Sequence, residues 1–350
     1  MSASDSNFLT NCWYAGAWAD ELPAGALVGR KILGEPVVFY RLANGEVAAL
    51  ENRCCHRSLP LSHGTLVGDH LQCGYHGLVY DRTGACIRVP GQDRVPREAK
   101  VKCYPAVEQD RIVWIWMGAP EQADTARIVR HPWHDDRAWA WTKDTYLINA
   151  NYQLITDNLM DLTHVGYVHA RTIGGTPEAH SGAQMNTERT AEGVKVTRWL
   201  LDSIPPPAYT KAVRFNKDRV DRWMEIEFFP PCVVRIHTGA TDAGTGAREG
   251  RREGGFGFMG FNAQTPETEH STHYFWSGAQ NYNVGQPDCT RQLRATLETT
   301  FAEDKVIVES QYATIRATPD APQINIASDG GMMQARRLIK ELIDRERKTI

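Results

Sequence analysis

Two short steps that pair a cysteine with a histidine lie close together early in the chain. Cys54 and His56 form a C-x-H step, and Cys73 and His76 form a C-x-x-H step, with sixteen residues between His56 and Cys73. Four ligands of these types can hold zinc or an iron–sulfur cluster. Zinc fingers commonly pair like with like, whereas each arm here carries one thiol and one imidazole. The mixed order favours a [2Fe–2S] cluster with one iron on two thiolates and the other on two imidazoles.

Such a cluster accepts an electron more readily than one held by four thiolates, because two neutral imidazoles replace two anionic ligands. It therefore suits an electron relay, and a relay needs a destination. The run TDNLMDLTHVGYVH offers four candidates for that destination: Asn158, Asp161, His164 and His169. His164 and His169 are five residues apart, about 140° around a regular helix. Both can face one metal only if the helix ends or distorts near Gly166; otherwise they are two ordinary helix histidines.

A third ligand is expected to be a carboxylate, because two imidazoles and one Asp or Glu leave open positions on Fe(II) for oxygen. Helical spacing joins four positions of a late predicted helix into one stripe: Leu297, Phe301, Asp304 and Val308. A carboxylate buried on an apolar stripe is costly without a partner, and a metal ion would be such a partner. Glu303 and Glu309 fall off this stripe and are expected to be solvated.

Composition limits what else the protein can be. The chain has 350 residues, 42% apolar and 23% charged, which is typical of a globular protein with one large domain or two ordinary ones. The net charge of −3 gives no indication of nucleic-acid binding or of a polybasic surface that binds membranes. No stretch is long and apolar enough to be expected to span a membrane. The eight cysteines are scattered, and the opening residues lack a secretory signal pattern. We therefore expect reduced thiols and a cytoplasmic protein.

The elements that must position these residues change in character along the chain. Up to about residue 120, short β signals alternate with turns, which predicts an all-β domain over 1–120 with both Cys/His steps on loops at strand ends. A second domain is predicted over 121–350, and its mixture of helices and strands indicates an α+β fold. Its helices are expected at 151–165, 291–316 and 332–348, and its strands at 194–200, 220–229, 232–238 and 271–277.

Two further segments bear on the substrate. The glycine-rich, charged segment 239–255 is expected to be a mobile surface loop, with a lid over a pocket as the alternative. The run CVVRIHTG alternates, so Arg235 and His237 share a face of a strand. If that face lines the cavity, Arg235 can hold a carboxylate or sulfonate; otherwise it lies on a solvated edge. Three other candidate pocket residues are Asn262, Trp276 and Tyr282.

Taken together, these motifs resemble the Rieske non-heme iron aromatic-ring oxygenases, in particular their O-demethylase and methyl-hydroxylase branch. The resemblance runs almost end to end: NCWYAGAW, CCHR with CGYHG, DNLMDLTHVGYVH, QTPETEHSTHYFWSGAQNY and FAEDK all contribute. One position departs from the pattern, since Cys55 stands where members of the family usually have proline. That exchange leaves the ligands intact but bears on the rigidity and oxidation sensitivity of the loop.

The resemblance implies an N-terminal Rieske domain and a C-terminal helix-grip (START-like) catalytic domain with an antiparallel sheet. It assigns the [2Fe–2S] cluster to Cys54, His56, Cys73 and His76, and mononuclear Fe(II) to His164, His169 and Asp304.

The resemblance also gives roles to the remaining polar residues of the histidine run. The family's aspartate at the position of Asp161 connects the iron ligand His164 to the Rieske residue His76 of a neighbouring subunit in a homotrimer. Asn158 is expected beside the iron.

The function that follows is the oxygenase component of a multicomponent monooxygenase. NAD(P)H electrons would arrive through a separate flavin and iron–sulfur reductase, and O2 would hydroxylate the methoxy or methyl group of an aromatic acid, with O-demethylation favoured. The alternatives are a ring cis-dihydroxylase acting on an aromatic carboxylate or sulfonate, a non-catalytic Rieske electron carrier with a ligand-binding domain, and a zinc-stabilised binding protein. The motifs do not identify the aromatic substrate.

Overall fold

The chain folds as two compact units. The computed structural model describes residues 7–349. Residues 7–130 and 265–269 form the first unit, and 131–264 and 270–349 form the second. Within the described part of the chain, no helix has the length and apolar character needed to cross a membrane.

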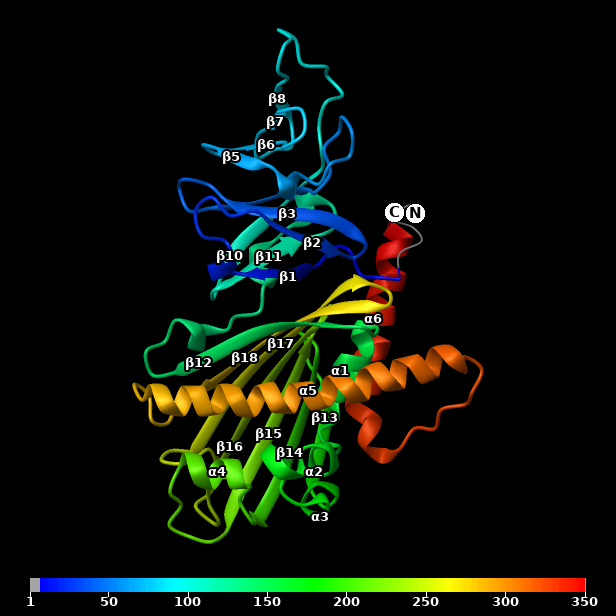
Figure 1. Ribbon diagram of the computed structural model, residues 1–350. Coiled ribbons are helices and arrows are strands. Elements are labelled where there is room, and N and C mark those ends of the chain that lie inside the picture. Colours follow the sequence, from blue (N-terminus) through cyan, green and yellow to red (C-terminus); the bar gives the residue numbers. More distant parts are fainter. Residues whose placement is uncertain (1–6, 350) are drawn as a thin grey trace. The chain divides into compact units, whose positions relative to one another are not determined.

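Three small antiparallel sheets make up the first unit, as its short β signals predict. Their strand orders are β1–β11–β10, β2–β3–β4–β9 and β5–β6–β7–β8 (Figure 1). The strands are β1 (Trp13–Trp18), β2 (Val28–Ile32), β3 (Glu35–Arg41), β4 (Val47–Glu51), β5 (Thr65–Val67), β6 (His70–Gln72), β7 (Val79–Tyr80), β8 (Cys86–Arg88), β9 (Cys103–Tyr104), β10 (Ala106–Gln109) and β11 (Ile112–Trp116). The second Cys/His step forms the turn between β6 and β7, in agreement with its predicted place on a loop at a strand end.

A seven-stranded antiparallel sheet forms the centre of the second unit, in the order β12–β18–β17–β16–β15–β14–β13 (Figure 1). Its strands are β12 (Ala140–Ile148), β13 (Gln184–Arg189), β14 (Val194–Ser203), β15 (Val220–Phe229), β16 (Val233–Asp242), β17 (Phe256–Thr268) and β18 (Ser271–Gln280). The four strands predicted from alternation are present as β14, β15, β16 and β18. The pattern misses β12, β13 and β17; β17 contains two glycines, and most of β13 is exposed, so neither shows a clean alternation.

The two faces of this sheet differ in what they pack against. Val196, Ile226 and Val234 belong to a core that also includes residues of three helices, α1 (Tyr152–Met160), α5 (Pro287–Ala317) and α6 (Gly330–Thr349). We call this side the helix face. Because side chains alternate along a strand, Glu227 and Arg235 point to the opposite face.

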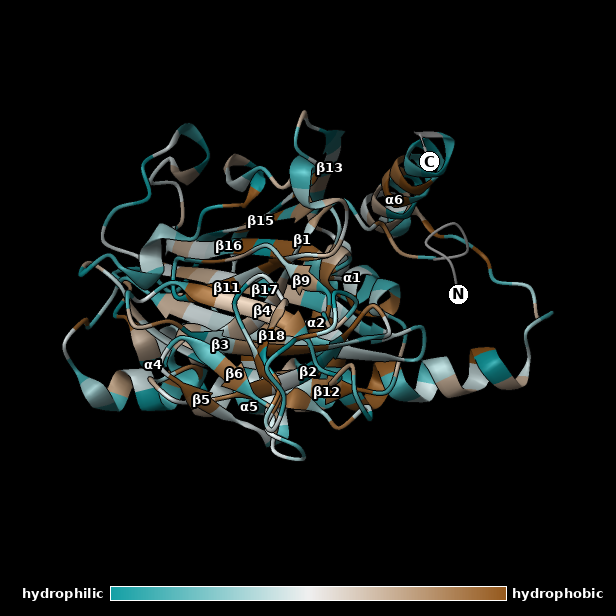
Figure 2. Cartoon of the chain, turned by 90° about the horizontal axis from the view of Figure 1, so that it is seen from above, coloured by the Kyte–Doolittle hydropathy of each residue, from teal (hydrophilic) through white to brown (hydrophobic). Residues whose placement is uncertain are grey.

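Helix α5 (Pro287–Ala317) runs across the helix face of the sheet (Figure 1). Three residues of the predicted stripe, Leu297, Asp304 and Val308, are buried, and the fourth, Phe301, is partly buried against the same core. Thr300, which is not part of the predicted stripe, is buried as well. Helix α6 (Gly330–Thr349) carries hydrophobic and hydrophilic residues along its length (Figure 2) and buries Ala335, Leu338 and Ile339. Both helices were expected from their periodicity, within four residues at each end.

Helix α1 (Tyr152–Met160) is shorter than the helix predicted over 151–165. It begins at the N-cap residue Asn151, whose side chain accepts a hydrogen bond from the Gln153 amide at 3.0 Å. It ends before Asp161, whose carboxylate accepts the Thr163 amide at 2.8 Å and so replaces the helical bonding pattern with a local turn. The predicted helix is therefore wrong over 161–164, and a separate short helix, α2 (Val165–Val168), follows.

The glycine-rich segment 239–255 is only partly a loop. Strand β16 continues to Asp242, so the loop predicted for the first four residues is wrong. Farther on, Ala247 is buried against Trp199 and Trp223, and the Arg252 guanidinium donates to Glu225 at 3.0 Å. These contacts hold the segment against the opposite face of the sheet.

Candidate metal centres

Two loops of the same form carry the Cys/His steps. In the first, the Ser58 amide donates to the Cys54 carbonyl at 2.9 Å, and in the second the Gly77 amide donates to the Cys73 carbonyl at 3.1 Å. Ser58 and Gly77 both adopt positive φ, 59° and 71°. This left-handed residue turns each loop back toward its sheet, and glycine adopts it without a steric penalty.

The loops separate the thiols from the imidazoles. Cys54 and Cys73 are 2% and 1% exposed, whereas His56 and His76 are exposed, with their ring centroids 4.6 Å apart. Two buried thiols beside two outer imidazoles fit a [2Fe–2S] cluster whose histidine-bound iron faces outward.

Tyr80 is a residue of this centre that the sequence analysis missed. Its buried hydroxyl lies 3.2 Å from Cys54 Sγ and 3.1 Å from Cys55 Sγ, and it accepts the Cys55 amide at 3.3 Å. Burial alone would raise the pKa of the Cys54 thiol, but hydrogen bonds from Tyr80 and from the loop amides lower it. No sequence signal marks Tyr80, because its position in β7 looks like that of any core tyrosine.

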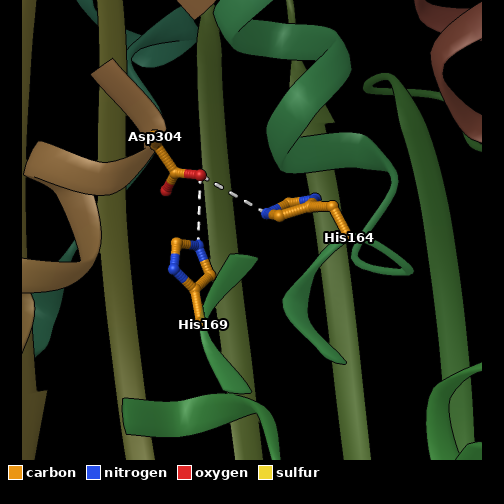
Figure 3. Close-up of side chains that lie close together, drawn as sticks. All are labelled: His164, His169 and Asp304. Carbon is orange, nitrogen blue, oxygen red and sulfur yellow. Dashed lines mark hydrogen bonds and ion pairs between the residues drawn. The ribbon is translucent and has the colours of Figure 1, made fainter. Parts of the chain in front are cut away.

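His164, His169 and Asp304 meet on the helix face of the second unit (Figure 3). One ligand atom from each lies within 4.8 Å of the others. Asp304 Oδ1 is 3.1 Å from His169 Nε2 and 3.5 Å from His164 Nε2. Two ligands of one metal, each bonded at about 2.1 Å, lie at roughly this separation. The break after α1 is what lets the two histidines converge, as the spacing analysis requires.

The second nitrogen of each imidazole is already engaged. His164 Nδ1 hydrogen-bonds to the Asp161 carbonyl oxygen at 2.7 Å, and His169 Nδ1 hydrogen-bonds to Glu303 Oε2 at 2.8 Å. When Nδ1 carries the proton, Nε2 of each ring offers its lone pair toward Asp304, which is the tautomer a metal ligand needs.

Glu303 is therefore a correction to the sequence analysis, which expects it to be solvated. It lies off the apolar stripe and its side chain is 30% exposed, yet its carboxylate reaches the nearly buried ring of His169. The reason is that His169 approaches α5 closely enough to contact two consecutive residues. The general need of a metal-bound histidine for a carboxylate or carbonyl partner is the signal that could have indicated Glu303.

The two histidines differ in their protonation. Burial lowers the pKa of His164, against the opposing charge of Asp304, and so favours the neutral ring that binds metals. Burial also acts to lower the pKa of His169, but hydrogen bonds and charge from Asp304 and Glu303 outweigh it and raise the pKa. A proton and a metal ion would compete for the same lone pair on Nε2 of His169, beside Asp304.

Asn158 and Asp161 lie at the same centre. The Asn158 side-chain amide donates to Asp304 Oδ1 at 3.0 Å, so the expected proximity of Asn158 to the ligand set is seen in the structure. Asp161 contacts His164 through its main-chain carbonyl rather than its carboxylate, which accepts the Thr163 amide instead.

The residues expected to line a substrate pocket do not come together. Asn262 and Trp276 lie on the helix face: the Tyr274 hydroxyl donates to Asn262 Oδ1 at 2.7 Å, and Trp276 packs on Phe301 of α5. Tyr282 lies instead in a small aromatic cluster with Tyr209 and Phe256.

Arg235 and His237 lie on the opposite face of the sheet. The Arg235 guanidinium pairs with Glu227 at 2.8 Å, and His237 Nδ1 bonds to Glu225 Oε2 at 2.9 Å. Arg235 and His237 thus each have an acidic partner on the neighbouring strand. Both side chains point away from the sheet face that α5 and Asp304 cover. We therefore do not assign Arg235 or His237 to a pocket at the second centre.

Comparison with known proteins finds similar domains in both parts of the chain. Residues 12–105 match the Rieske [2Fe–2S] domain, and residues 148–345 match the vanillate O-demethylase oxygenase C-terminal domain. The chain is 39% identical to the iron–sulfur subunit of the toluene-4-sulfonate monooxygenase system of Comamonas testosteroni, covering 97% of this chain and 98% of that one. It is 36% identical to the vanillate O-demethylase oxygenase subunit of Pseudomonas sp. strain HR199, covering 97% and 96%.

A solved structure of dicamba monooxygenase bound to 3,6-dichlorosalicylic acid superposes with a TM-score of 0.89 at 31% identity, covering 97% of this chain and 98% of that one. Another structure of dicamba monooxygenase contains non-heme iron. The predicted fold class and family are confirmed, and the Rieske match excludes the zinc alternative for the first centre. The chain therefore belongs to the Rieske non-heme iron oxygenases of the vanillate O-demethylase type, as an oxygen-dependent oxidoreductase with a [2Fe–2S] cluster and a mononuclear iron.

Proposed function

We propose that this oxygenase component hydroxylates the methoxy or methyl group of an aromatic acid, with O-demethylation and release of formaldehyde as the favoured reaction. The meeting of His164, His169 and Asp304 carries the proposal, because two imidazoles and one carboxylate leave open positions on Fe(II). The names of the relatives are consistent with either outcome, since one is a toluene-4-sulfonate monooxygenase and another a vanillate O-demethylase.

We assign the cluster to Cys54, His56, Cys73 and His76 in a domain over residues 1–120, and the iron to a domain over 121–350. When bound, the two groups together supply single electrons and activation of O2, by which one oxygen atom enters the substrate and the other leaves as water. The residues of the chain provide geometry. Glu303 and the Asp161 carbonyl fix the two imidazoles, while Asn158 holds Asp304 Oδ1. On a methoxy carbon the hydroxylated product is a hemiacetal, which collapses to a phenol and formaldehyde.

Electrons are proposed to cross between subunits of a homotrimer, from His76 of the partner subunit through Asp161 to His164. Exposed aromatic rings beside both centres support this arrangement. Tyr75 is 62% exposed and its ring lies 3.8 Å from that of His76 in the same chain. Tyr167, between the two iron-binding histidines, is 69% exposed. Exposed aromatic side chains of this kind are enriched at protein interfaces.

Relatives are named as oxygenase components, so a separate reductase supplies the electrons. We propose that this reductase is an NAD(P)H-dependent flavin and iron–sulfur protein, and that both proteins are cytoplasmic. A ring cis-dihydroxylase uses the same metal ligands, so product analysis must distinguish it.

Product analysis is the direct test of the reaction. The purified protein, a reductase, NADH and O2 are incubated with methoxybenzoates, toluates and arylsulfonates. We expect formaldehyde and a phenol in equal amounts from a methoxybenzoate, or a benzylic alcohol from a methylated acid. A cis-diol as the main product would establish the dihydroxylase instead, and no product from any member of the panel would reject the proposed substrate class.

Replacing Glu303 tests how the iron site is held. Glu303→Gln should weaken iron binding by about 10-fold to 100-fold, because it removes the carboxylate that orients His169. Iron retention is measured by competition with a chelator, and the visible spectrum of the cluster reports that the first unit is intact. Glu298→Gln, on the same helix and paired with Arg294, is the matched control and should retain iron. Asp304→Ala should lose the iron altogether, and normal retention by that variant would overturn the ligand assignment.

Removing the Tyr80 hydroxyl should make the cluster harder to reduce. Hydrogen bonds to the ligand sulfurs stabilise the more negative, reduced cluster, so Tyr80→Phe should lower the reduction potential by on the order of 60–100 mV. Tyr40→Phe is the control, because the Tyr40 hydroxyl is buried in the same core without a hydrogen-bond partner among residues 7–349. Equal potentials for both variants would show that the Tyr80 contact does not tune the cluster.

The intersubunit route makes a separate prediction. Asp161→Asn should retain both iron centres and bind substrate, because the main-chain carbonyl that holds His164 remains. It should nevertheless slow single-turnover oxidation of the pre-reduced cluster severely, because it removes the carboxylate charge that we propose reaches His76 of the partner subunit. Rapid-mixing absorbance at the cluster bands measures this step. Asp344→Asn, an exposed change on α6 next to Lys340, should oxidise at the wild-type rate. A wild-type rate for Asp161→Asn would remove Asp161 from the electron route.

A further inference from the structure

Two buried arginines on the helix face form no ion pair with a carboxylate in the part of the chain that the structure describes. Arg198 and Arg222 are 2% and 1% exposed. In the strand register Arg198 lies opposite Met224 and Arg222 lies opposite Leu200, so the two guanidinium-bearing residues are diagonal neighbours on the same face. No ion pair joins either arginine to an acidic residue among residues 7–349. The other buried residues of these two strands are either apolar or, like Ser203 and Asp221, hydrogen-bonded.

The bonding capacity of the pair is largely unused. Arg198 donates through Nη2 to the His180 carbonyl at 2.7 Å, while its Nε and Nη1 have no acceptor in the described chain. Among residues 7–349, Arg222 makes two long contacts, to the Gly174 carbonyl at 3.4 Å and to the Tyr209 hydroxyl at 3.5 Å, and its Nε has no acceptor there. Normal hydrogen bonds of this kind are about 2.9 Å, so these contacts are weak.

Two like charges held out of water are costly, and each disfavours the other. Burial and the charge of Arg222 lower the pKa of Arg198, and the charge of Asp161 opposes them only in part. Burial lowers the pKa of the adjacent His180 to about 4, with further contributions from Arg222 and Arg198. That histidine is therefore neutral at pH 7 and adds no third charge. The excess positive charge is fixed, and an anion is the partner that would compensate it.

The pair lies next to the segment that follows the second iron-binding histidine. Gly174, whose carbonyl Arg222 contacts, ends the turn that starts after His169, and its amide donates to the His169 carbonyl at 3.0 Å. Arg222 thus contacts the backbone segment that is hydrogen-bonded to His169.

An aromatic surface adjoins the pair on the other side. The Tyr209 ring lies 4.8 Å from Arg222 Cζ and stacks on Phe256 at 3.9 Å. Tyr282 completes this cluster, and Phe258 packs against both it and the core beneath α5. The cluster therefore supplies apolar ring faces directly beside the Arg222 guanidinium.

We propose that Arg198 and Arg222 recognise the carboxylate or sulfonate of the aromatic substrate, with Arg222 as the direct contact and Arg198 beside it. Guanidinium groups bind both anions with short, charge-assisted hydrogen bonds, which would replace the two long contacts of Arg222. The inference rests on the proposed function, because it assigns the acidic group of that substrate class. It also replaces Arg235, the anion-binding residue suggested by the sequence, with two arginines on the face that carries the iron site.

The first test needs no variant. Binding of 4-methylbenzenesulfonate and 4-methoxybenzoate to the protein with its cluster and iron in place is measured by calorimetry, beside the neutral isosteres 4-methylbenzenesulfonamide and 4-methoxybenzamide. The acids should bind at least about tenfold more tightly than the amides, the difference expected for hydrogen bonds to a charged group. Equal affinities would overturn the assignment, and so would sulfate displacing neither acid.

Variants then locate the site. Arg222→Gln should raise the Kd of each acid by about 10-fold to 100-fold and leave the Kd of the amides unchanged. Arg198→Lys, which keeps the charge but not the planar donor geometry, should show the same pattern more weakly. Arg235→Gln, on the opposite face and paired with Glu227, should bind acids as the wild type does. Iron retention and the cluster spectrum show that each variant is folded.

The outcomes separate the two proposals. If Arg222→Gln binds the acids normally, or if Arg235→Gln is the variant that loses them, the arginine pair is not the anion site, while hydroxylation by the wild type still supports the proposed function. If the acids bind through the pair but no panel member is hydroxylated, the binding site stands and the proposed reaction fails. Equal weakening of acids and amides with loss of iron would show a structural role only, and would overturn the inference.

Discussion

The carboxylate of Asp304 is the constraint to which the rest of the second unit conforms. It lies on the buried stripe of α5 between Leu297 and Val308, where an ionised group needs a partner. The chain brings polar groups from more than 130 residues earlier to meet it: His164, His169 and the amide of Asn158. Regular helix could not present all three, because five residues of helix turn the second histidine away. The early end of α1 is thus part of the site rather than a defect of the helix.

The ligand set and the architecture could be predicted from the sequence, whereas the groups that hold the ligands could not. Residue type and spacing restrict a metal ligand strongly, and the stripe on α5 depends only on helical periodicity. Glu303 and Tyr80 act through contacts that depend on how closely two elements approach, and no local pattern encodes that distance. Helix α1 was predicted too long because the competing turn at Asp161 depends on a single side-chain hydrogen bond.

The sequence did contain a signal for the buried arginines, in the alternation used to predict the strands. Arg198 follows Val194 and Val196 at inward positions of β14, and Arg222 precedes Met224 in the same phase of β15. A charged residue in the apolar phase of a strand is unusual and indicates a function. The sequence suggested Arg235 as the anion-binding residue because the residues around it alternate clearly. Alternation, however, shows only which residues share a face of the strand. It does not show which face carries the site.

The two faces of the sheet differ in whether their charged side chains form ion pairs, and this difference affects which substrates can bind. On the opposite face, hydrogen bonding to His237 lowers the pKa of Glu225 to about 2 against the effect of burial, with Arg252 adding to the shift, and Arg235 pairs with Glu227. Each of these charged groups has a partner of opposite charge within the protein. On the helix face, no ion pair within residues 7–349 joins Arg198 or Arg222 to a carboxylate, and the charge of Asp161 only partly counters the cost of burying Arg198. A protein can sustain such an imbalance where a ligand completes it, because the cost of the unpaired cations is then recovered only on binding the correct anion. Neutral aromatic compounds of the same shape would bind without that gain, so the imbalance itself would select for acids.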